Sequence, residues 1–209
     1  MSYYNVNTLF NHSRYMKDQL CSLNTDQAIE VFKTGYTKFM NDIPSKKTLA
    51  ILVAQSALET GWWRAGLHCW NFGNTRCNPD KLSDGEYFTM FKCGEIIKGK
   101  EVFFIPPDPR SVFQAFESAE AGVRHHLLFL STKNNYRNAW AQAVKQNPDQ
   151  YIIELKKAGY FTAGLERYKK TFMSVYNTIL AKIEDDKFEI SDDLKNQITR
   201  DIDNIIRNR

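Results

Sequence analysis

The segment between Pro44-Ser45 and Thr60-Gly61 most constrains the fold, because it is a helical stretch that is apolar nearly all round. Its apolar positions include Leu49, Leu52 and Val53. Ser45 suits a helix N-cap, and a glycine suits the turn that ends a helix. A helix without a polar face has to be covered by other elements on every side. The sequence therefore predicts a central, buried helix within a larger helical body.

Other segments carry apolar residues at three- and four-residue spacing, which is typical of amphipathic helices. The predicted helices span about 24–40, 118–130, 136–145, 148–158, 165–179 and 191–206. Asn24 and Ser118 suit N-caps, and Asn147-Pro148 suits a cap followed by proline at the first helical position. The chain is therefore predicted to be mainly α.

The stretch from Gly61 to Pro109 differs, because it holds six of the ten glycines and four of the six prolines. Within it, Tyr87–Lys92 and Glu101–Ile105 are predicted to pair as strands around a turn near 94–99. We expect a loop and a small β-hairpin inserted in the helical body.

Size and charge exclude several classes of protein. The 209 residues are 43% hydrophobic with a net charge of +4, which suits a folded domain and is too weakly basic for a dedicated nucleic-acid binder. The longest apolar run, Leu49–Ala54, is far shorter than the roughly 20 residues of a membrane span, so no membrane insertion is expected. The N-terminus does not resemble a secretory signal, so we expect a cytoplasmic protein or export by a route without such a signal.

The cysteines and histidines give no clear metal or nucleophile motif. Cys69 and Cys77 are eight residues apart beside His68, but the two tight ligand pairs of structural zinc are missing. We therefore expect free thiols and no metal. A nucleophile pair of Cys69 or Cys93 with His125 or His126 is an alternative that spacing does not support. For the two adjacent histidines, a packed or solvated pair is favoured.

Glu59 is the main candidate for chemistry, because it closes the most apolar helix beside Trp62 and Trp63. Poor solvation and the partial negative charge of a helix C-terminus both raise a carboxyl pKa, and a protonated carboxyl can act as a general acid. Lysozyme is the standard worked example of this logic. The alternative is a surface glutamate that merely ends a helix.

Four motifs, in order, carry a family resemblance over about 45–182. Ala54–Trp63 reads A-Q-S-A-L-E-T-G-W-W and resembles the catalytic helix end of the peptidoglycan glucosaminidases, which include flagellar muramidases and bacterial autolysins. Trp70–Asn74 looks like the family's Asn-x-Phe-Gly loop, and Phe113–Ser118 looks like its Phe-Arg-x-Tyr-x-Ser segment, which opens the next helix. Lys157–Thr162, with Tyr168 downstream, looks like its Ala-Gly-Tyr-Ala-Thr element.

This resemblance implies a lysozyme-like helical domain over 45–182 with a small inserted β-hairpin lobe. Residues 1–44 would then form a helical extension packed on it, and 183–209 an amphipathic C-terminal helix. It implies Glu59 as the general acid, and Glu86, Glu95 and Glu101 are the candidates for a second acid on the hairpin, with Glu95 favoured. A solvated turn residue is the alternative for Glu95. The implied substrate contacts are Trp62, Asn71, Phe72, Tyr160, Thr162 and Tyr168. Trp63 is either a further wall of the sugar site or part of the core, and Trp140 is expected in the core.

The predicted function is hydrolysis of a β-1,4 bond of bacterial peptidoglycan without a metal or cofactor. A lytic transglycosylase and a non-catalytic glycan-binding or structural module are the alternatives, with a Cys–His hydrolase of the peptide stem ranked last. The two flanking pieces suggest docking to a larger assembly, such as a phage virion or a secretion apparatus. The competing expectation for that tail is that its apolar face folds back on the body.

Overall fold

The computed structural model describes residues 6–82, 85–97 and 100–183, and in this part of the chain it confirms the mainly α class. The α-helices are α1 (Thr25–Met40), α2 (Lys46–Glu59), α3 (Ala119–Thr132), α4 (Arg137–Val144), α5 (Pro148–Lys157) and α6 (Leu165–Lys182). The short 3-10 helices are η1 (Val6–Asn11), η2 (Pro79–Lys81) and η3 (Pro109–Ser111). The strands are β1 (Tyr87–Met90), β2 (Cys93–Ile97), β3 (Lys100–Phe104) and β4 (Val112–Ala115). None of the described helices combines the length and the apolar character that crossing a membrane requires.

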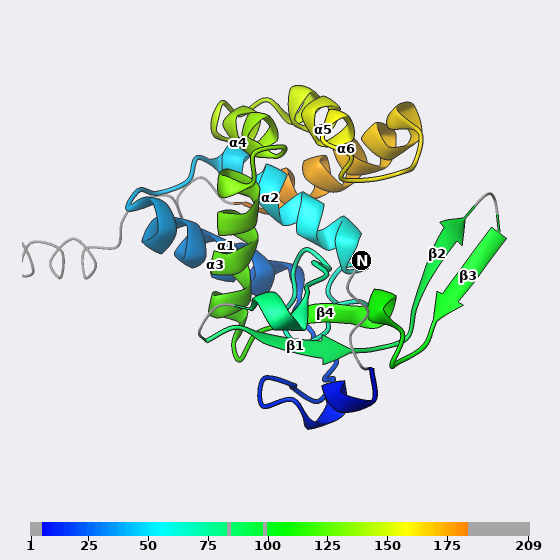
Figure 1. Ribbon diagram of the computed structural model, residues 1–209. Coiled ribbons are helices and arrows are strands. Elements are labelled where there is room, and N and C mark those ends of the chain that lie inside the picture. The colour runs from blue at the N-terminus through cyan, green and yellow to red at the C-terminus, as the bar shows by residue number, and fades with distance from the viewer. Residues whose placement is uncertain (1–5, 83–84, 98–99, 184–209) are drawn as a thin grey trace, which may run out of the picture.

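Helix α2 is the centre of the core, as its sequence predicts. Every residue from Thr48 to Ala57 is buried. Figure 1 shows α2 crossing the middle of the helical body, with α4, α5 and α6 above it and strands β1 and β4 below it. Because covering elements lie on both sides, the apolar side chains on every face of this helix are removed from water, and their burial stabilises the fold.

The helix boundaries follow local capping chemistry. Asn24 forms a capping box with Gln27, in which each side chain accepts a hydrogen bond from the backbone of the other residue. Ser45 and Ser118 accept backbone hydrogen bonds at the starts of α2 and α3. Asn147 caps α5 and is followed by proline at the first helical position. These caps satisfy orphan N–H groups with nearby residues, which is why sequence alone located the helix starts. The predicted helix over 191–206 lies outside the described residues.

The predicted pairing of the strands is wrong. Segment 87–92 was expected to pair with 101–105, but β1 pairs antiparallel with β4 and Tyr87 faces Ala115. Strands β2 and β3 form a separate hairpin in which Glu95 faces Val102. The motif Phe113–Ser118 predicts the start of the next helix. Its first residues instead belong to strand β4, and the helix begins only after Ser118. The hairpin projects from the body on the side where α2 ends (Figure 1).

The chain before α1 lies along the loop and strand that follow α2. Phe88 of β1 exchanges backbone hydrogen bonds with Arg14 and Met16, and Cys69 N donates to Gln19 O at 2.8 Å. A hydrogen bond of 2.8 Å between His68 Nδ1 and Asp18 Oδ1 adds a side-chain link. This segment and α1 therefore contact the body directly, while the division into three parts at residues 45 and 183 stays a prediction.

Candidate active site

Glu59 is the last residue of α2, and the turn after it places its side chain at the edge of the core. The Thr60 hydroxyl donates to Ser56 O at 2.7 Å and closes the final turn of the helix. Gly61 and Trp62 then adopt left-handed φ angles of 57° and 61°, and Trp62 N donates to Ala57 O at 2.7 Å. The helix therefore ends abruptly and leaves Glu59 half-buried.

The two tryptophans after Glu59 have different positions. Trp63 is fully buried, and its indole N–H donates to Ser56 Oγ at 3.0 Å, so of its two expected places it takes the one in the core. Trp62 is half-buried and packs edge-on against Trp63, with ring centroids 6.1 Å apart. Trp62 therefore stays partly exposed in the turn that follows Glu59.

Burial and one hydrogen bond determine the charge state of Glu59. Burial raises the pKa of this carboxyl from 4.5 to about 7, because the ionised form loses solvation. The Tyr168 hydroxyl donates to Glu59 Oε1 at 3.1 Å and partly offsets that rise. Tyr168 comes from α6 and stacks on Phe161 at a centroid distance of 3.7 Å. A carboxyl group with this pKa can both give and take a proton near neutral pH.

The loop after Glu59 contains an unusual number of left-handed residues other than glycine. They are Trp62, Trp63, Cys69, Trp70 and Asn74, with φ between 44° and 61°. Each such residue costs about 1–3 kcal/mol unless the surrounding structure holds it in place. Strain of this kind gathers at functional sites, which agrees with the position of this loop beside Glu59.

Asn71 and Phe72, predicted to contact substrate, lie in the interior instead. Phe72 is fully buried, and Asn71 is only 1% exposed. The Asn71 amide nitrogen donates to the carbonyl oxygens of Thr75 and Gln114, both at 3.0 Å, and its oxygen accepts from Thr75 N at 2.9 Å. All three of these hydrogen bonds of the Asn71 side chain are therefore with the protein itself. We correct the predicted role: the two residues shape the loop.

Asn74 is the residue of this loop that reaches Glu59, and sequence reasoning missed it. Its side-chain amide donates to the backbone carbonyl of Glu59. The carbonyl groups in the last turn of a helix need partners from outside the helix, and Asn74 supplies one. Asparagine tolerates the left-handed φ of 45° found here, which is the signal that the sequence did offer.

Tyrosines from α5 and from the turn before α6 complete the surroundings of Glu59. Tyr151 is fully buried, and its hydroxyl donates to the side-chain oxygen of Gln55, one turn before Glu59. Tyr160 is half-buried, and burial followed by the charge of Glu59 raises its pKa. The structure thus places Tyr160 and Tyr168 near Glu59. Thr162 is exposed, and its carbonyl oxygen accepts from Lys156 Nζ at 3.1 Å.

Glu95, the predicted second acid, lies on the β2–β3 hairpin and is engaged by an arginine. Arg76 Nη2 is 2.6 Å from Glu95 Oε1, and the two side chains are 39% and 42% exposed. The Arg76 guanidinium also lies 5.5 Å from the ring centroid of Phe113 in β4. This contact ties the hairpin to the body. It also means that Glu95 is held by a protein cation and not presented as an unpaired carboxylate.

The cysteines and histidines do not form a nucleophile pair in the described residues. Burial raises the pKa of Cys69, so its thiol stays protonated at neutral pH. His126 is 1% exposed, and burial lowers its pKa to about 3. A Cβ at Gly73 would lie 2.7 Å from His126 Nδ1, so this ring supports the loop, as expected for a packed histidine. Within the described residues, no three His, Cys, Asp or Glu side chains gather into a possible metal site.

Comparison with known proteins identifies the family. Residues 41–181 match the glucosaminidase family, described as mannosyl-glycoprotein endo-beta-N-acetylglucosaminidase. The chain belongs to this family. The matched range begins just before α2 and ends within α6, so Glu59, the loop after it and Tyr168 all fall inside the glucosaminidase region.

Relatives of this glucosaminidase chain include one curated protein and two solved structures. Peptidoglycan hydrolase FlgJ of Pseudomonas aeruginosa is 28% identical over 140 residues, which cover 59% of this chain and 32% of that protein. The chain thus spans about a third of that relative's length. The crystal structure of a peptidoglycan hydrolase from Sphingomonas sp. A1 has a TM-score of 0.51 at 19% identity, over 74% of this chain and 87% of that one. A truncated glycoside hydrolase domain of Salmonella typhimurium FlgJ has a TM-score of 0.49 at 18% identity, over 76% and 99%.

The likeness to the Sphingomonas structure shows the fold, and the lysozyme-like, mainly α architecture is thereby confirmed.

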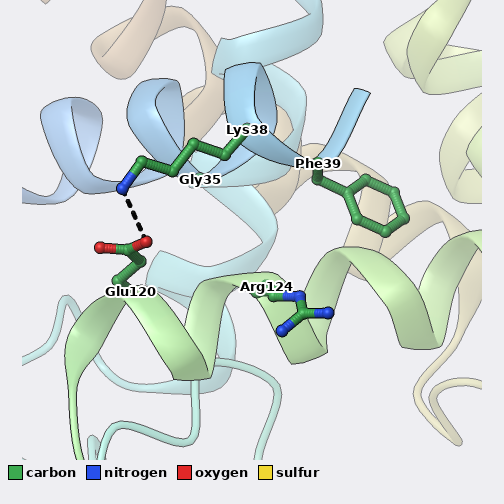
Figure 2. Close-up of a pocket in the computed structure, with 5 residues that line it drawn as sticks. All are labelled: Gly35, Lys38, Phe39, Glu120 and Arg124. Atoms are coloured by element: carbon green, nitrogen blue, oxygen red, sulfur yellow. Dashed lines mark hydrogen bonds and ion pairs between the residues drawn. The ribbon is translucent and has the colours of Figure 1, made fainter. Parts of the chain in front are cut away.

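A separate hollow of about 230 Å³ lies between α1 and α3 (Figure 2). Figure 2 shows its ion pair of 2.8 Å between Lys38 and Glu120, with Arg124 one turn further along α3. None of the residues around Glu59 lines this hollow.

Proposed function

We propose that this glucosaminidase cleaves a β-1,4 glycosidic bond of bacterial cell-wall glycan, with Glu59 as the general acid. The observation that carries the proposal is the half-buried carboxyl at the end of α2, whose pKa is raised to about 7. Family membership supports glycosidic chemistry, and the relative from Pseudomonas aeruginosa is named a peptidoglycan hydrolase.

In the proposed reaction, protonated Glu59 gives its proton to the glycosidic oxygen as the bond from that oxygen to the anomeric carbon breaks. Positive charge then develops on the sugar ring, and the leaving sugar departs as an alcohol. The Tyr168 hydroxyl, 3.1 Å from Glu59 Oε1, stabilises the carboxylate that forms. Water adds to the anomeric carbon and loses a proton to a base, which completes hydrolysis.

The remaining predicted contacts are assigned by exposure. Trp62, Tyr160 and Tyr168 are half-buried, and we propose that sugar faces pack on their rings. Thr162 is exposed on the loop before α6 and stays a proposed polar contact. Glu95 stays the proposed second acid, and in that role it has to exchange its contact with Arg76 for one with substrate.

The test is digestion of purified peptidoglycan by wild type and by Glu59→Gln, followed by mass spectrometry of the product ends. Glu117→Gln, at an exposed position just before α3, is the matched control. We expect reducing ends with wild type and with the control. Glu59→Gln should lower the cleavage rate by at least about a hundredfold, which is the lower end of the range for general acid catalysis. Intact glycan after treatment with wild type refutes the proposal.

The engagement of Glu95 by Arg76 favours a lytic transglycosylase as the second candidate, because that reaction needs one acid. It predicts 1,6-anhydro ends and full activity in Glu95→Gln. If the products have reducing ends and Glu95→Gln loses most of the cleavage activity, hydrolysis with two acids is supported. A non-catalytic glycan-binding module predicts that wild type cleaves nothing and that Glu59→Gln binds glycan as tightly as wild type does.

We also propose that residues outside the family match dock the enzyme to a larger assembly, such as a virion or a secretion apparatus. Residues 184–209, which contain the predicted amphipathic helix, lie outside the described part of the chain. Deleting them tests the idea. A soluble monomer with unchanged stability supports docking, whereas a large loss of stability assigns the segment to the core.

A further inference from the structure

A second hollow, of about 410 Å³, lies between the C-terminal half of α3 and the chain that leads into β1. One wall contains His125, Phe129 and Lys133, and the opposite wall contains Thr75 and Lys81. This size suits a small organic group or a few residues of a peptide. The sequence motifs do not point to it, because its walls come from segments that are distant in the chain.

The hollow has an excess of positive charge. Its lining contains Arg76, Lys81 and Lys133, against a single carboxylate, Glu86. Arg76 is already paired with Glu95, which does not line the hollow. In the described residues, no carboxylate pairs with Lys81 or Lys133. Two ammonium groups are therefore available to an anionic ligand.

Glu86 offsets one of these two positive charges, and the other groups in the wall add no charge. Glu86 lies near His125 and Cys77, whose pKa values respond to its charge. Burial lowers the pKa of His125, so that side chain is neutral at pH 7. Gln114 and Thr75 add uncharged polar residues to the lining. The lining thus suits a ligand with a carboxylate and neutral amides.

The hollow connects to Glu59 through two sets of contacts. The carbonyl oxygens of the lining residues Thr75 and Gln114 accept hydrogen bonds from the Asn71 amide. The same loop carries Asn74, whose amide donates to the Glu59 carbonyl oxygen. On the α3 side, the ring of Phe129 lies 5.1 Å from Tyr136, and Tyr136 lies 5.4 Å from Tyr160. A ligand in the hollow therefore contacts residues that are linked to the proposed cleavage site.

We infer that this hollow binds a carboxylate of the peptide stem carried by the glycan, through Lys81 and Lys133. The inference rests on the proposed function, because it names a further part of the same substrate. Peptide stems carry free carboxylates and amide groups at regular intervals along the strand, whereas the sugar hydroxyls are neutral. Recognition of the stem at this position adds binding energy remote from the bond that breaks.

The test compares Lys81→Gln/Lys133→Gln with a matched control, Lys47→Gln/Lys145→Gln, which removes two exposed lysines elsewhere. Each protein is assayed on strands with stems and on strands stripped of stems by an amidase. We expect the first double variant to raise KM about three- to tenfold on strands with stems, as for exposed charge pairs, with kcat unchanged. The effect should shrink in 1 M salt because the charges are screened.

Other outcomes overturn the inference. The amidase frees a lactyl carboxylate that is an amide in strands with stems, so a rise in KM only on stripped strands assigns the lysines to that group, and an equal rise on both substrates shows that they do not recognise the stem. An unchanged KM on both substrates removes the site altogether. If wild type cleaves neither substrate, the proposed function fails instead, and the inference is then judged by sedimentation with insoluble peptidoglycan. If less of the first double variant than of the control sediments with peptidoglycan that carries stems, and the two sediment equally with stripped peptidoglycan, the stem site is still supported. Equal sedimentation on both materials refutes it.

Discussion

Replacing Glu59 by glutamine tests the reasoning about its environment without any substrate. In the folded protein its pKa is about 7, against 4.5 for the ordinary carboxyl group. At about 1.4 kcal/mol for each pH unit between the two values, ionising Glu59 costs the folded state about 3 kcal/mol. Glutamine keeps an oxygen that can accept from Tyr168 and carries no charge, so the variant avoids this cost.

The sign and the pH window follow from the two pKa values. Below pH 4.5 the carboxyl is protonated in both the folded and the unfolded state, so wild type and Glu59→Gln should be equally stable, apart from a constant offset. Between pH 4.5 and about 7, wild type loses stability relative to the variant, and above that the difference should level off near 3 kcal/mol. In thermal unfolding, this is a rise of about 6–12 °C for the variant at pH 8.

The assay is urea or thermal unfolding at pH 4, 6 and 8, followed by tryptophan fluorescence, with Glu117→Gln as the control for losing one charge. Glu117 is exposed, and it lies outside α2 and the loop around Glu59. A stability difference between wild type and Glu59→Gln that does not change with pH refutes the assignment of a raised pKa to Glu59.

Three further predictions concern the support of the site. Tyr168→Phe removes a hydrogen bond that lowers the pKa of Glu59, so the alkaline limb of the rate–pH profile should move to higher pH; a move to lower pH contradicts the assigned role. Asn71→Ala removes three hydrogen bonds to the backbone, one of them buried, and should cost about 3 kcal/mol in urea unfolding, whereas a loss below about 0.5 kcal/mol counts against its role in shaping the loop. Gly122→Ala places a Cβ 1.9 Å from the carbonyl oxygen of Trp70 and should lower stability by about 1–3 kcal/mol; an unchanged Tm argues against that close approach.

Prediction from sequence succeeded where the signal was local. All six described α-helices were expected, because apolar spacing and caps such as Asn24, Ser45 and Ser118 act within a few residues. The strand segments near 87–92 and 101–105 were also located, but their partners were not. The pairing of β1 with β4 depends on contacts between distant parts of the chain, and short strands carry little information about which partner they take.

The site shows the same division. Motif order located Glu59, Tyr160 and Tyr168, and the structure places them near one another. The motifs also contained Asn71 and Phe72, which are buried, since a motif does not distinguish a residue that touches a ligand from one that shapes the loop. Burial depends on the packing of the whole loop against α3 and β4.

The sequence by itself determined that the chain is mainly α, that an apolar helix lies at its centre, and that a glutamate closes this helix beside two tryptophans. Only the tertiary structure decided that Trp63 is buried while Trp62 is partly exposed, that Tyr168 reaches Glu59, and that Lys81 faces a hollow shared with α3. The physical reason is the range of the interactions. Helix periodicity and capping act over a few residues, whereas the desolvation that raises the pKa of Glu59 requires segments more than a hundred residues apart to pack together.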